Sequence, residues 1–418
     1  MQARLGQWLE GSPQTRWVWA GVFCASVLAA LAFRLAALAS LFAGEVTDYA
    51  HFYHPVARHL LAGQGLVDRM GRFPVRYPPG YPLLLAGVFW VADALHISEG
   101  TAVVTFNLLC MGLASVLVFV LARSVWGTRA GLAAALLWLT YPFALWVAAH
   151  PTAEAPFLPF FFAAALIFWR ALQADRPGWL PFAAAGVLWG SAMLIRPAAL
   201  GLGPIMASVA VADGLRRSLR RRLEQAAAIL VGGLLVVLPW EALAYARTGQ
   251  IIVLSTGSVP GIRDGLTFAV YEGKGRTPIW VPAGVEAVQR AVLARYDELR
   301  SAGDVAAVLA EQIREQPLGV AGLFAIKAAR SWYGTDSQAH DSSVLLVQLP
   351  YLTVILWGSR SAFKRGGQAR RLAVLVWLVA LYSWGMTILV LSILRYMLPA
   401  VGLLFALAPG ALRLNRHC

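Results

Sequence analysis

Residues 101–122 read TAVVTFNLLCMGLASVLVFVLA, a stretch of 22 residues without a charged side chain. A helix needs roughly 20 consecutive apolar residues to cross the hydrocarbon core of a bilayer, so this stretch predicts a membrane-spanning helix. The whole chain has the same character, because 59% of its 418 residues are hydrophobic and 13% are charged. In soluble domains, about 45–50% of the residues are hydrophobic and about 25% are charged. We therefore expect an all-α polytopic membrane protein.

Working outward from this stretch, similar apolar runs predict about ten membrane-spanning helices. They cover residues 17–42, 101–122, 130–148, 154–172, 179–195, 197–212, 225–246, 342–358, 372–391 and 396–412. The first run is longer than the apolar part of a signal peptide and has no clear cleavage site before Gly44, so we expect it to be retained. Cys24, Cys110 and Cys418 form no CxxC pair and predict no disulfide framework.

Residues 81–97 are apolar, but the run is short and carries Pro82, Asp93 and His96. If this run does not cross the membrane, the loops on one side contain 18 of the 35 Lys and Arg residues and 4 of the 21 acids. Cytoplasmic loops are rich in Lys and Arg, so that side is predicted to be the cytoplasm of a plasma (inner) membrane. The basic segments are the N-terminus, 123–129, 170–178, 213–224, 359–371 and the C-terminal tail.

This topology puts both termini and the whole net charge of +14 in the cytoplasm. Residues 81–97 are then expected to form a helix in or near the outer interface. The arginine-rich run 216–222 is interpreted as an orientation signal facing anionic lipid, which argues against nucleic-acid binding. Two large external segments remain, 43–100 and 247–341, on a single domain of residues 1–418.

Two acids, Glu45 and Asp48, follow the first predicted span directly. A carboxylate at the end of a helix can act as a general base towards an acceptor hydroxyl, although acids after a span are also ordinary interfacial residues. His51, His54 and His59 follow, and the first two share a helix face with Asp48. Because no HExxH or Cys/His signature is present, solvated or hydrogen-bonding histidines are favoured over a metal site.

The sequence then reads GRFPVRYPPGYPLLLAG, in which Pro78 and Pro79 exclude a continuous helix. Tyr77 and Tyr81 flank this turn, and Arg76 precedes it. Arginine and tyrosine side chains at this depth either hold a lipid phosphate or anchor the chain in the interface. The sequence leaves both interpretations open.

Further polar residues lie at the predicted outer ends of spans, where a charge costs less than at the membrane centre. These residues are His150, Glu154, Arg196, Arg395 and Tyr396. Acids that activate a nucleophile, together with arginines that bind a phosphate, are what transfer from a lipid phosphate requires. Because the predicted topology places all these residues on the same side of the membrane, we expect the chemistry to occur at the external face.

The second external segment has glycine-rich turns but no GxxxxGK[ST] or GxGxxG pattern, so it predicts no nucleotide loop. Residues 283–332 are expected to be helical, with Lys327 and Arg330 on a helix at the interface. This segment is interpreted either as a flap that covers a substrate or as a surface elaboration.

Three motifs in this order carry a resemblance to a known family. They are YPPGYPLLLAGVF at 77–89, VFVLARSVWGTRAGLAAALLWLTYPF at 118–143 and HPTAEAPFLPFFFAAALIFWRAL at 150–172. The chain resembles the membrane glycosyltransferases of the GT-C fold. It is closest to the dolichyl-phosphate-mannose protein mannosyltransferases and their bacterial relatives, which include the aminoarabinose lipid A transferase. The resemblance implies a GT-C-like fold with external juxtamembrane helices.

The resemblance also implies roles for individual residues. Asp48 matches the family's essential base, Glu154 matches its acid after the third span, and either Glu45 or Glu154 serves as the second acid. Arg76 matches the family's basic residue near the PP turn, which holds the donor phosphate, and Arg395 matches a common Arg near the last external turn. Both are expected to bind the donor. Tyr77, Tyr81, Arg196 and Tyr396 are expected beside them, and His150 is expected on the acceptor side.

The function implied is an inverting transfer of a sugar from a polyprenyl-phosphate donor to a hydroxyl acceptor on a glycan, lipid or protein. No cofactor is predicted, and a divalent metal is the less favoured alternative. The rival functions are a transporter or flippase of lipid-linked sugars and a lipid-linked ligase. A transporter is disfavoured because it would have polar groups near the midplane and related halves.

Overall fold

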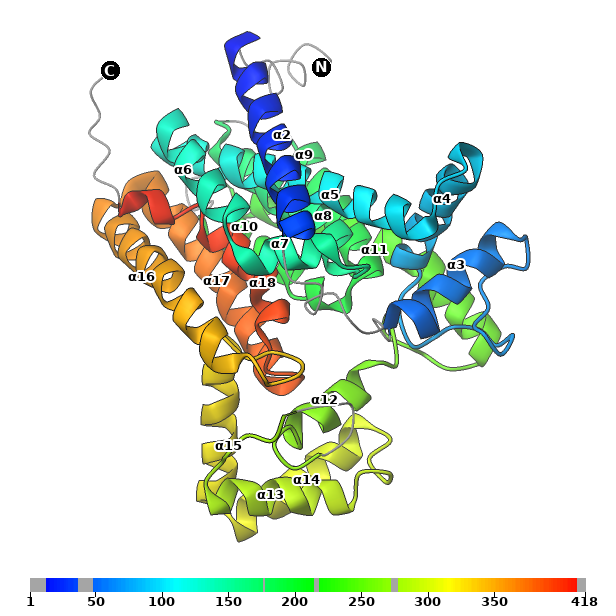
Figure 1. The fold of residues 1–418 in the computed structure, drawn as a ribbon. Coiled ribbons are helices and arrows are strands. Elements are labelled where there is room, and N and C mark those ends of the chain that lie inside the picture. Colours follow the sequence, from blue (N-terminus) through cyan, green and yellow to red (C-terminus); the bar gives the residue numbers. More distant parts are fainter. Residues whose placement is uncertain (1–12, 37–47, 176, 214–217, 272–276, 412–418) are drawn as a thin grey trace.

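The computed structural model describes residues 13–36, 48–175, 177–213, 218–271 and 277–411. Within these ranges every regular element is a helix, so the expected all-α fold is confirmed. Figure 1 shows the long helices gathered in one body, with a smaller group of helices at its lower end and α3 and α4 at one side.

Six helices in the described ranges are long and apolar enough to cross a bilayer. They are α2 (Pro13–Ala36), α5 (Glu99–Trp126), α8 (Glu154–Gln173), α11 (Leu219–Thr248), α16 (Asp341–Arg365) and α17 (Gly367–Leu389). A seventh candidate is the pair α6 (Thr128–Leu139) and α7 (Pro142–Ala149), which is bent by 59°. The bend follows from Pro142, which disfavours a helical conformation at Tyr141.

The predicted count of about ten spans is not confirmed by this finding. Three of the predicted spans fold as shorter helices of 16, 12 and 11 residues, which are α9 (Leu180–Ile195), α10 (Leu202–Asp213) and α18 (Leu394–Leu404). At 1.5 Å per residue they measure about 24 Å or less, whereas the hydrocarbon core is about 30 Å thick. Helices buried in protein are as apolar as helices that face lipid, so composition did not separate the two kinds.

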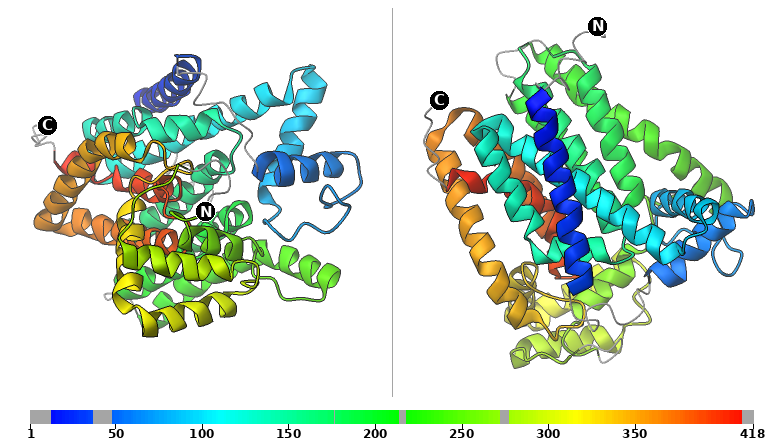
Figure 2. Two further views of the ribbon diagram at one scale, coloured as in Figure 1. Left: turned by 60° about the horizontal axis from the view of Figure 1, so that its bottom comes forward. Right: turned by 45° about the horizontal axis from the view of Figure 1, so that its top comes forward.

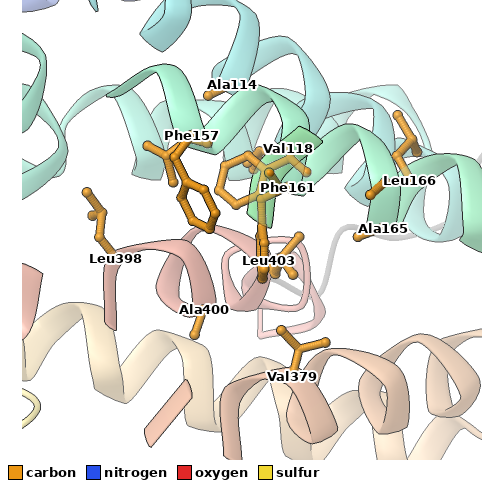
Figure 3. Close-up of a cluster of buried hydrophobic side chains, with 14 of the residues drawn as sticks. Ala114, Val118, Phe157, Phe161, Ala165, Leu166, Val379, Leu398, Ala400 and Leu403 are labelled. Carbon is orange, nitrogen blue, oxygen red and sulfur yellow. The ribbon is translucent and has the colours of Figure 1, made fainter. Parts of the chain in front are cut away.

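The centre of the body is formed by α8, whose apolar stretch is the most buried among the six long helices. Phe157 and Phe161 of α8 lie in one buried cluster with Val118 of α5 and with Leu398 and Leu403 of α18 (Figure 3). This packing keeps the short helix α18 inside the body. It thereby fixes the start of α18, which carries Arg395.

The helices α9 and α11 approach each other through glycines. Gly186 and Gly190 of α9 lie in the segment GVLWG, and a Cβ atom at position 190 would come within 2.6 Å of the Gly233 carbonyl oxygen of α11. Small residues spaced by four allow this kind of close approach between helices in a membrane. The end of α9, which is followed by Arg196, is therefore held against a long helix.

The segment 247–341 contains a small helical unit with its own apolar core, in which Leu266 and Leu323 are buried. The unit consists of α12 (Ser258–Leu266), α13 (Ala283–Ala294), α14 (Ala302–Glu315) and α15 (Pro317–Arg330). Viewed from below, the unit lies across one end of the body (Figure 2, left). Residues 283–332 are thus largely helical, as predicted.

The segment 43–100 contains the π-helical turn η2 (Tyr49–Tyr53), α3 (His54–Leu61) and α4 (Gly80–Leu95). The Arg58 side chain ties these elements together by donating to Asp93 at 2.8 and 3.0 Å and to Glu99 at 2.8 Å. The run 81–97 is thus mostly helical, with a length of 16 residues that does not place α4 among the six long helices.

Candidate functional site

Asp48 lies directly before η2, and its carboxylate accepts a hydrogen bond of 2.9 Å from the Tyr77 hydroxyl. Acids at helix starts commonly cap backbone N–H groups, but the Asp48 side chain makes no cap of this kind. Burial, together with the nearby Asp48 charge, raises the pKa of the Tyr77 phenol. Tyr77 therefore remains a donor and uses one of the roughly four lone-pair sites of the carboxylate.

The turn after Tyr77 is pressed against the body at Gly80. A Cβ atom at position 80 would lie 2.5 Å from the Leu194 carbonyl oxygen near the end of α9. Glycine is required here because any side chain would separate α4 from α9. The close approach brings the segment 43–100 beside the end of α9, which Arg196 follows.

Glu154, Arg196 and Arg395 form a buried group of charges that we call the Glu154 triad. One carboxylate oxygen of Glu154 lies 2.5 Å from Arg196 Nη1 and 2.9 Å from Arg395 Nε. The ring of Tyr396 flanks both guanidinium groups, with its centroid 5.3 Å from the Arg196 Cζ and 5.5 Å from the Arg395 Cζ. The triad combines two cations with one anion, so it carries one excess positive charge.

Breaks between helices position the triad. Arg196 is extended, with φ of −145°, because it precedes Pro197. Glu154 begins α8 after the break at His150, where the His150 Nδ1 donates to the Trp146 carbonyl at 2.8 Å. The Asn107 amide donates to the His150 carbonyl at 2.6 Å. His150 thus stabilises the break before Glu154.

Asp48 and the Glu154 triad belong to one site. The buried Tyr53 interacts electrostatically with Asp48, Glu154 and Arg196, and Arg395 interacts electrostatically with Asp48. The fully buried Tyr81 ring packs against Tyr53 with centroids 4.9 Å apart, and its phenol interacts with Glu154. The structure therefore brings together these predicted residues: Asp48, Tyr77, Tyr81, Glu154, Arg196, Arg395 and Tyr396.

Arg76 lies at the edge of this site rather than in the triad. Its exposed guanidinium stacks over the Phe52 ring at 4.5 Å and lies 5.7 Å from the Tyr77 ring. These three residues line a cavity of about 390 Å³ that is also bordered by Thr256. The Thr256 N–H donates to the Val75 carbonyl at 2.9 Å, so the segments 43–100 and 247–341 meet here.

Lys327 and Arg330, which were assigned to a flap, are buried. The Lys327 amine donates to the carbonyls of Gly265 and Val390 at 2.9 and 3.0 Å, and its burial lowers the pKa to about 7. Arg330 donates to Asp341 at 3.1 and 2.9 Å. Both side chains therefore anchor α15 to its neighbours. Glu45, the other candidate for the second acid, lies outside the described residues.

The three histidines of the first segment have separate partners. His54 lies 2.5 Å from Glu99, His59 donates to the Val67 carbonyl at 3.0 Å, and His51 accepts from Arg69 at 2.7 Å. In the part of the chain that the structure describes, no three His, Cys, Asp or Glu side chains gather into a metal-binding group.

Two residues of the site were not found from the sequence. Tyr53 lies in the aromatic run YAHFY, which gave no indication that its ring would connect Asp48 to Glu154. Asp336 follows α15 in an ordinary polar loop, and its carboxylate lies 3.7 Å from Arg395 Nη1. Only the fold brings Asp336 beside Arg395.

A comparison with family models supports the resemblance. Residues 77–242 match the model of the dolichyl-phosphate-mannose-protein mannosyltransferase family, which covers less than half of the chain. The match includes Tyr77, Glu154 and Arg196 of the site. No curated protein has a sequence that matches this chain significantly.

Two solved structures of an Archaeoglobus fulgidus oligosaccharyltransferase are similar in fold. One is a complex with Zn and sulfate, with a TM-score of 0.54 and 16% identity. The match covers 93% of this chain and 48% of the oligosaccharyltransferase chain. The other is AglB in complex with an inhibitory peptide and a dolichol-phosphate, with a TM-score of 0.55 and 15% identity. The match covers 95% of this chain and 50% of the AglB chain. The chain thus spans about half the length of these structures. It is a multi-pass membrane protein with the GT-C-like fold that its sequence predicted, and it resembles the mannosyltransferase family over residues 77–242.

Proposed function

We propose that this protein is an inverting glycosyltransferase that moves a sugar from a polyprenyl-phosphate donor to a hydroxyl acceptor. The observation that carries the proposal is the pairing of Asp48, held by Tyr77, with the buried Glu154 triad. A base beside a group of arginines with excess positive charge suits attack by a hydroxyl and departure of a phosphate.

In the proposed reaction, Asp48 removes the proton of the acceptor hydroxyl as the oxygen attacks the anomeric carbon of the donor sugar. The bond between that carbon and the phosphate oxygen breaks, and the polyprenyl phosphate leaves with the bonding electron pair. One displacement of this kind inverts the configuration at the anomeric carbon. Arg196 and Arg395 stabilise the charge that develops on the departing phosphate, and Arg76 guides the donor at the edge of the site.

The similar proteins support the lipid donor. The family of the matching model takes its name from a dolichyl-phosphate sugar donor, and AglB was solved with a dolichol-phosphate. The sugar and the acceptor of this chain are left unassigned. The proposal also places the site at the external face of the plasma membrane, with both termini in the cytoplasm and the unit α12–α15 as a flap over the substrate.

The test is the substitution Asp48→Asn, which removes the base and keeps the size of the side chain. We expect transfer to fall by about 10²- to 10⁴-fold in an assay with a polyprenyl-phosphate sugar, with the thermal unfolding temperature unchanged. Tyr77→Phe is the matched variant, because it removes the hydrogen bond to Asp48 but keeps the base. It should lose about tenfold. Near-normal transfer by the purified Asp48→Asn protein would show that Asp48 is not the base.

The topology has its own test. The test uses a protein in which Cys24, Cys110 and Cys418 are replaced by serine. Single cysteines are then introduced by Asp297→Cys in the α12–α15 unit and by Gln368→Cys at the start of α17, both at exposed positions. A membrane-impermeant maleimide added to intact cells should label the first position and leave the second unlabelled. The opposite pattern would place the proposed site on the cytoplasmic side.

A further inference from the structure

Asp336 lies at the open side of the Glu154 triad. Its carboxylate is 3.7 Å from Arg395 Nη1, and its side chain is 54% exposed, whereas the Glu154 side chain is 5% exposed. Arg395 thus has one buried anion at 2.9 Å and one solvated anion at 3.7 Å, and it also interacts electrostatically with Asp48. Together, the charges of Glu154 and Asp336 balance the two arginines of the triad.

The backbone holds Asp336 at this position. The Leu394 N–H, next to Arg395, donates to the Gly334 carbonyl at 2.8 Å. The Thr335 N–H and hydroxyl both donate to Asp341 at 2.8 Å. The loop between α15 and α16 is therefore attached at Gly334 and Thr335, the two residues before Asp336. These hydrogen bonds hold the loop so that the Asp336 carboxylate faces Arg395.

A phosphate monoester would compete with Asp336 for the same N–H groups. Arginine binds phosphate and carboxylate through the same forked donors, and Glu154 faces Nε, which leaves Nη1 directed to Asp336. A pair with one side chain more than half exposed is weak, since exposed ion pairs contribute about 0.2–1 kcal/mol. Displacement of Asp336 by a phosphate is therefore easy, and so is its return.

We propose that Asp336 is an internal counter-ion that occupies the phosphate position of Arg395 in the empty site and competes with lipid phosphate. This role rests on the proposed function, in which Arg395 binds the donor phosphate. Asp336 keeps the triad neutral before the donor binds, and after transfer its return to Arg395 helps to release the polyprenyl phosphate product. It is a positioning residue that sets lipid-phosphate affinity.

The test measures binding of farnesyl phosphate, a short polyprenyl phosphate, to the full-length protein in detergent by titration calorimetry. Asp336→Asn should bind it about two- to five-fold more tightly than the wild type, which is the fold-change that corresponds to an exposed ion pair. Asp336→Glu keeps the charge and should retain the wild-type affinity. Asp297→Asn removes a different exposed acid of the same external segment and should have no effect.

Steady-state assays give a second readout that a purely structural role would not change. Asp336→Asn should lower KM for the lipid donor and strengthen inhibition by farnesyl phosphate, without a rise in kcat. Unchanged or weaker binding by Asp336→Asn would overturn the counter-ion role while leaving the proposed function in place, provided that Arg395→Lys still weakens binding. A wild-type protein that binds farnesyl phosphate no better than farnesol would overturn both.

Discussion

Two groups of buried charge in this molecule are built differently. In the Arg330–Asp341 pair, one arginine faces one acid, and both carboxylate oxygens of Asp341 accept hydrogen bonds from Arg330 or Thr335. In the Glu154 triad, two arginines share a single oxygen of one acid. A closed, balanced pair stabilises the fold, whereas a group with excess cation and one weak counter-ion is suited to receive an anion.

The largest effect expected from this comparison concerns the closed pair. Arg330→Met leaves the Asp341 carboxylate buried without its cation, which should lower the free energy of unfolding by about 3–5 kcal/mol. Thermal or denaturant unfolding in detergent measures the loss. The control is Arg290→Met, because Arg290 forms an exposed pair with Glu286 and should contribute about 0.5 kcal/mol or less. Equal losses for the two variants would contradict the structural role of the Arg330–Asp341 pair.

A smaller effect, on catalysis rather than stability, is expected for the open triad. Arg395→Lys keeps the positive charge but removes the forked donors that match a phosphate. A hydrogen bond to a charged group contributes about 1.5–3 kcal/mol, so kcat/KM for the lipid donor should fall roughly 10- to 150-fold. The unfolding temperature should change little. A variant that loses stability but transfers normally would make Arg395 another structural residue like Arg330.

A pH-dependent effect on stability concerns Lys327, the neighbour of the closed pair. Burial lowers its pKa from 10.5 to about 7. Between pH 7 and 10.5 the unfolded lysine therefore holds a proton that the folded lysine lacks, and stability rises with pH by up to about 1.4 kcal/mol per unit. Below pH 7 both forms are protonated and this slope disappears. Lys327→Met should remove the slope in unfolding measured across this range. Parallel curves for the two proteins would show that Lys327 does not titrate as described.

Much of the fold was predictable because it depends on apolar runs and on proline. The long helices and the helical run 81–97 follow from local sequence. Residues 130–148 were predicted as one span, but the chain breaks at Pro142 and forms α6 and α7. The number of spans did not follow from the sequence, because the apolar runs of α9, α10 and α18 do not reveal that these helices are shorter than the six long ones. The small core of the α12–α15 unit also escaped prediction, since its residues are spread over four helices.

The candidate site was predictable in part for a different reason. Asp48, Glu154, Arg196 and Arg395 stand out because they are charged residues at the ends of long apolar runs, although a charge costs less there than at the membrane centre. Lys327 has the same signature, and the sequence could not show that its amine is satisfied by two carbonyl groups. Asp336 has no such signature, because acids are common in polar loops. Its contact with Arg395 exists only in the folded chain.

The separation of the site residues along the chain has a consequence for biogenesis. Glu154 is synthesised long before Arg395, which is carried by the last apolar helix, α18. Until α18 inserts, Glu154 has only Arg196 as a close partner, and the pair carries no excess positive charge for a phosphate. Under the proposed function, we expect a chain in which α18 has not yet packed against α8 to transfer no sugar, because Arg395 is then missing from the site.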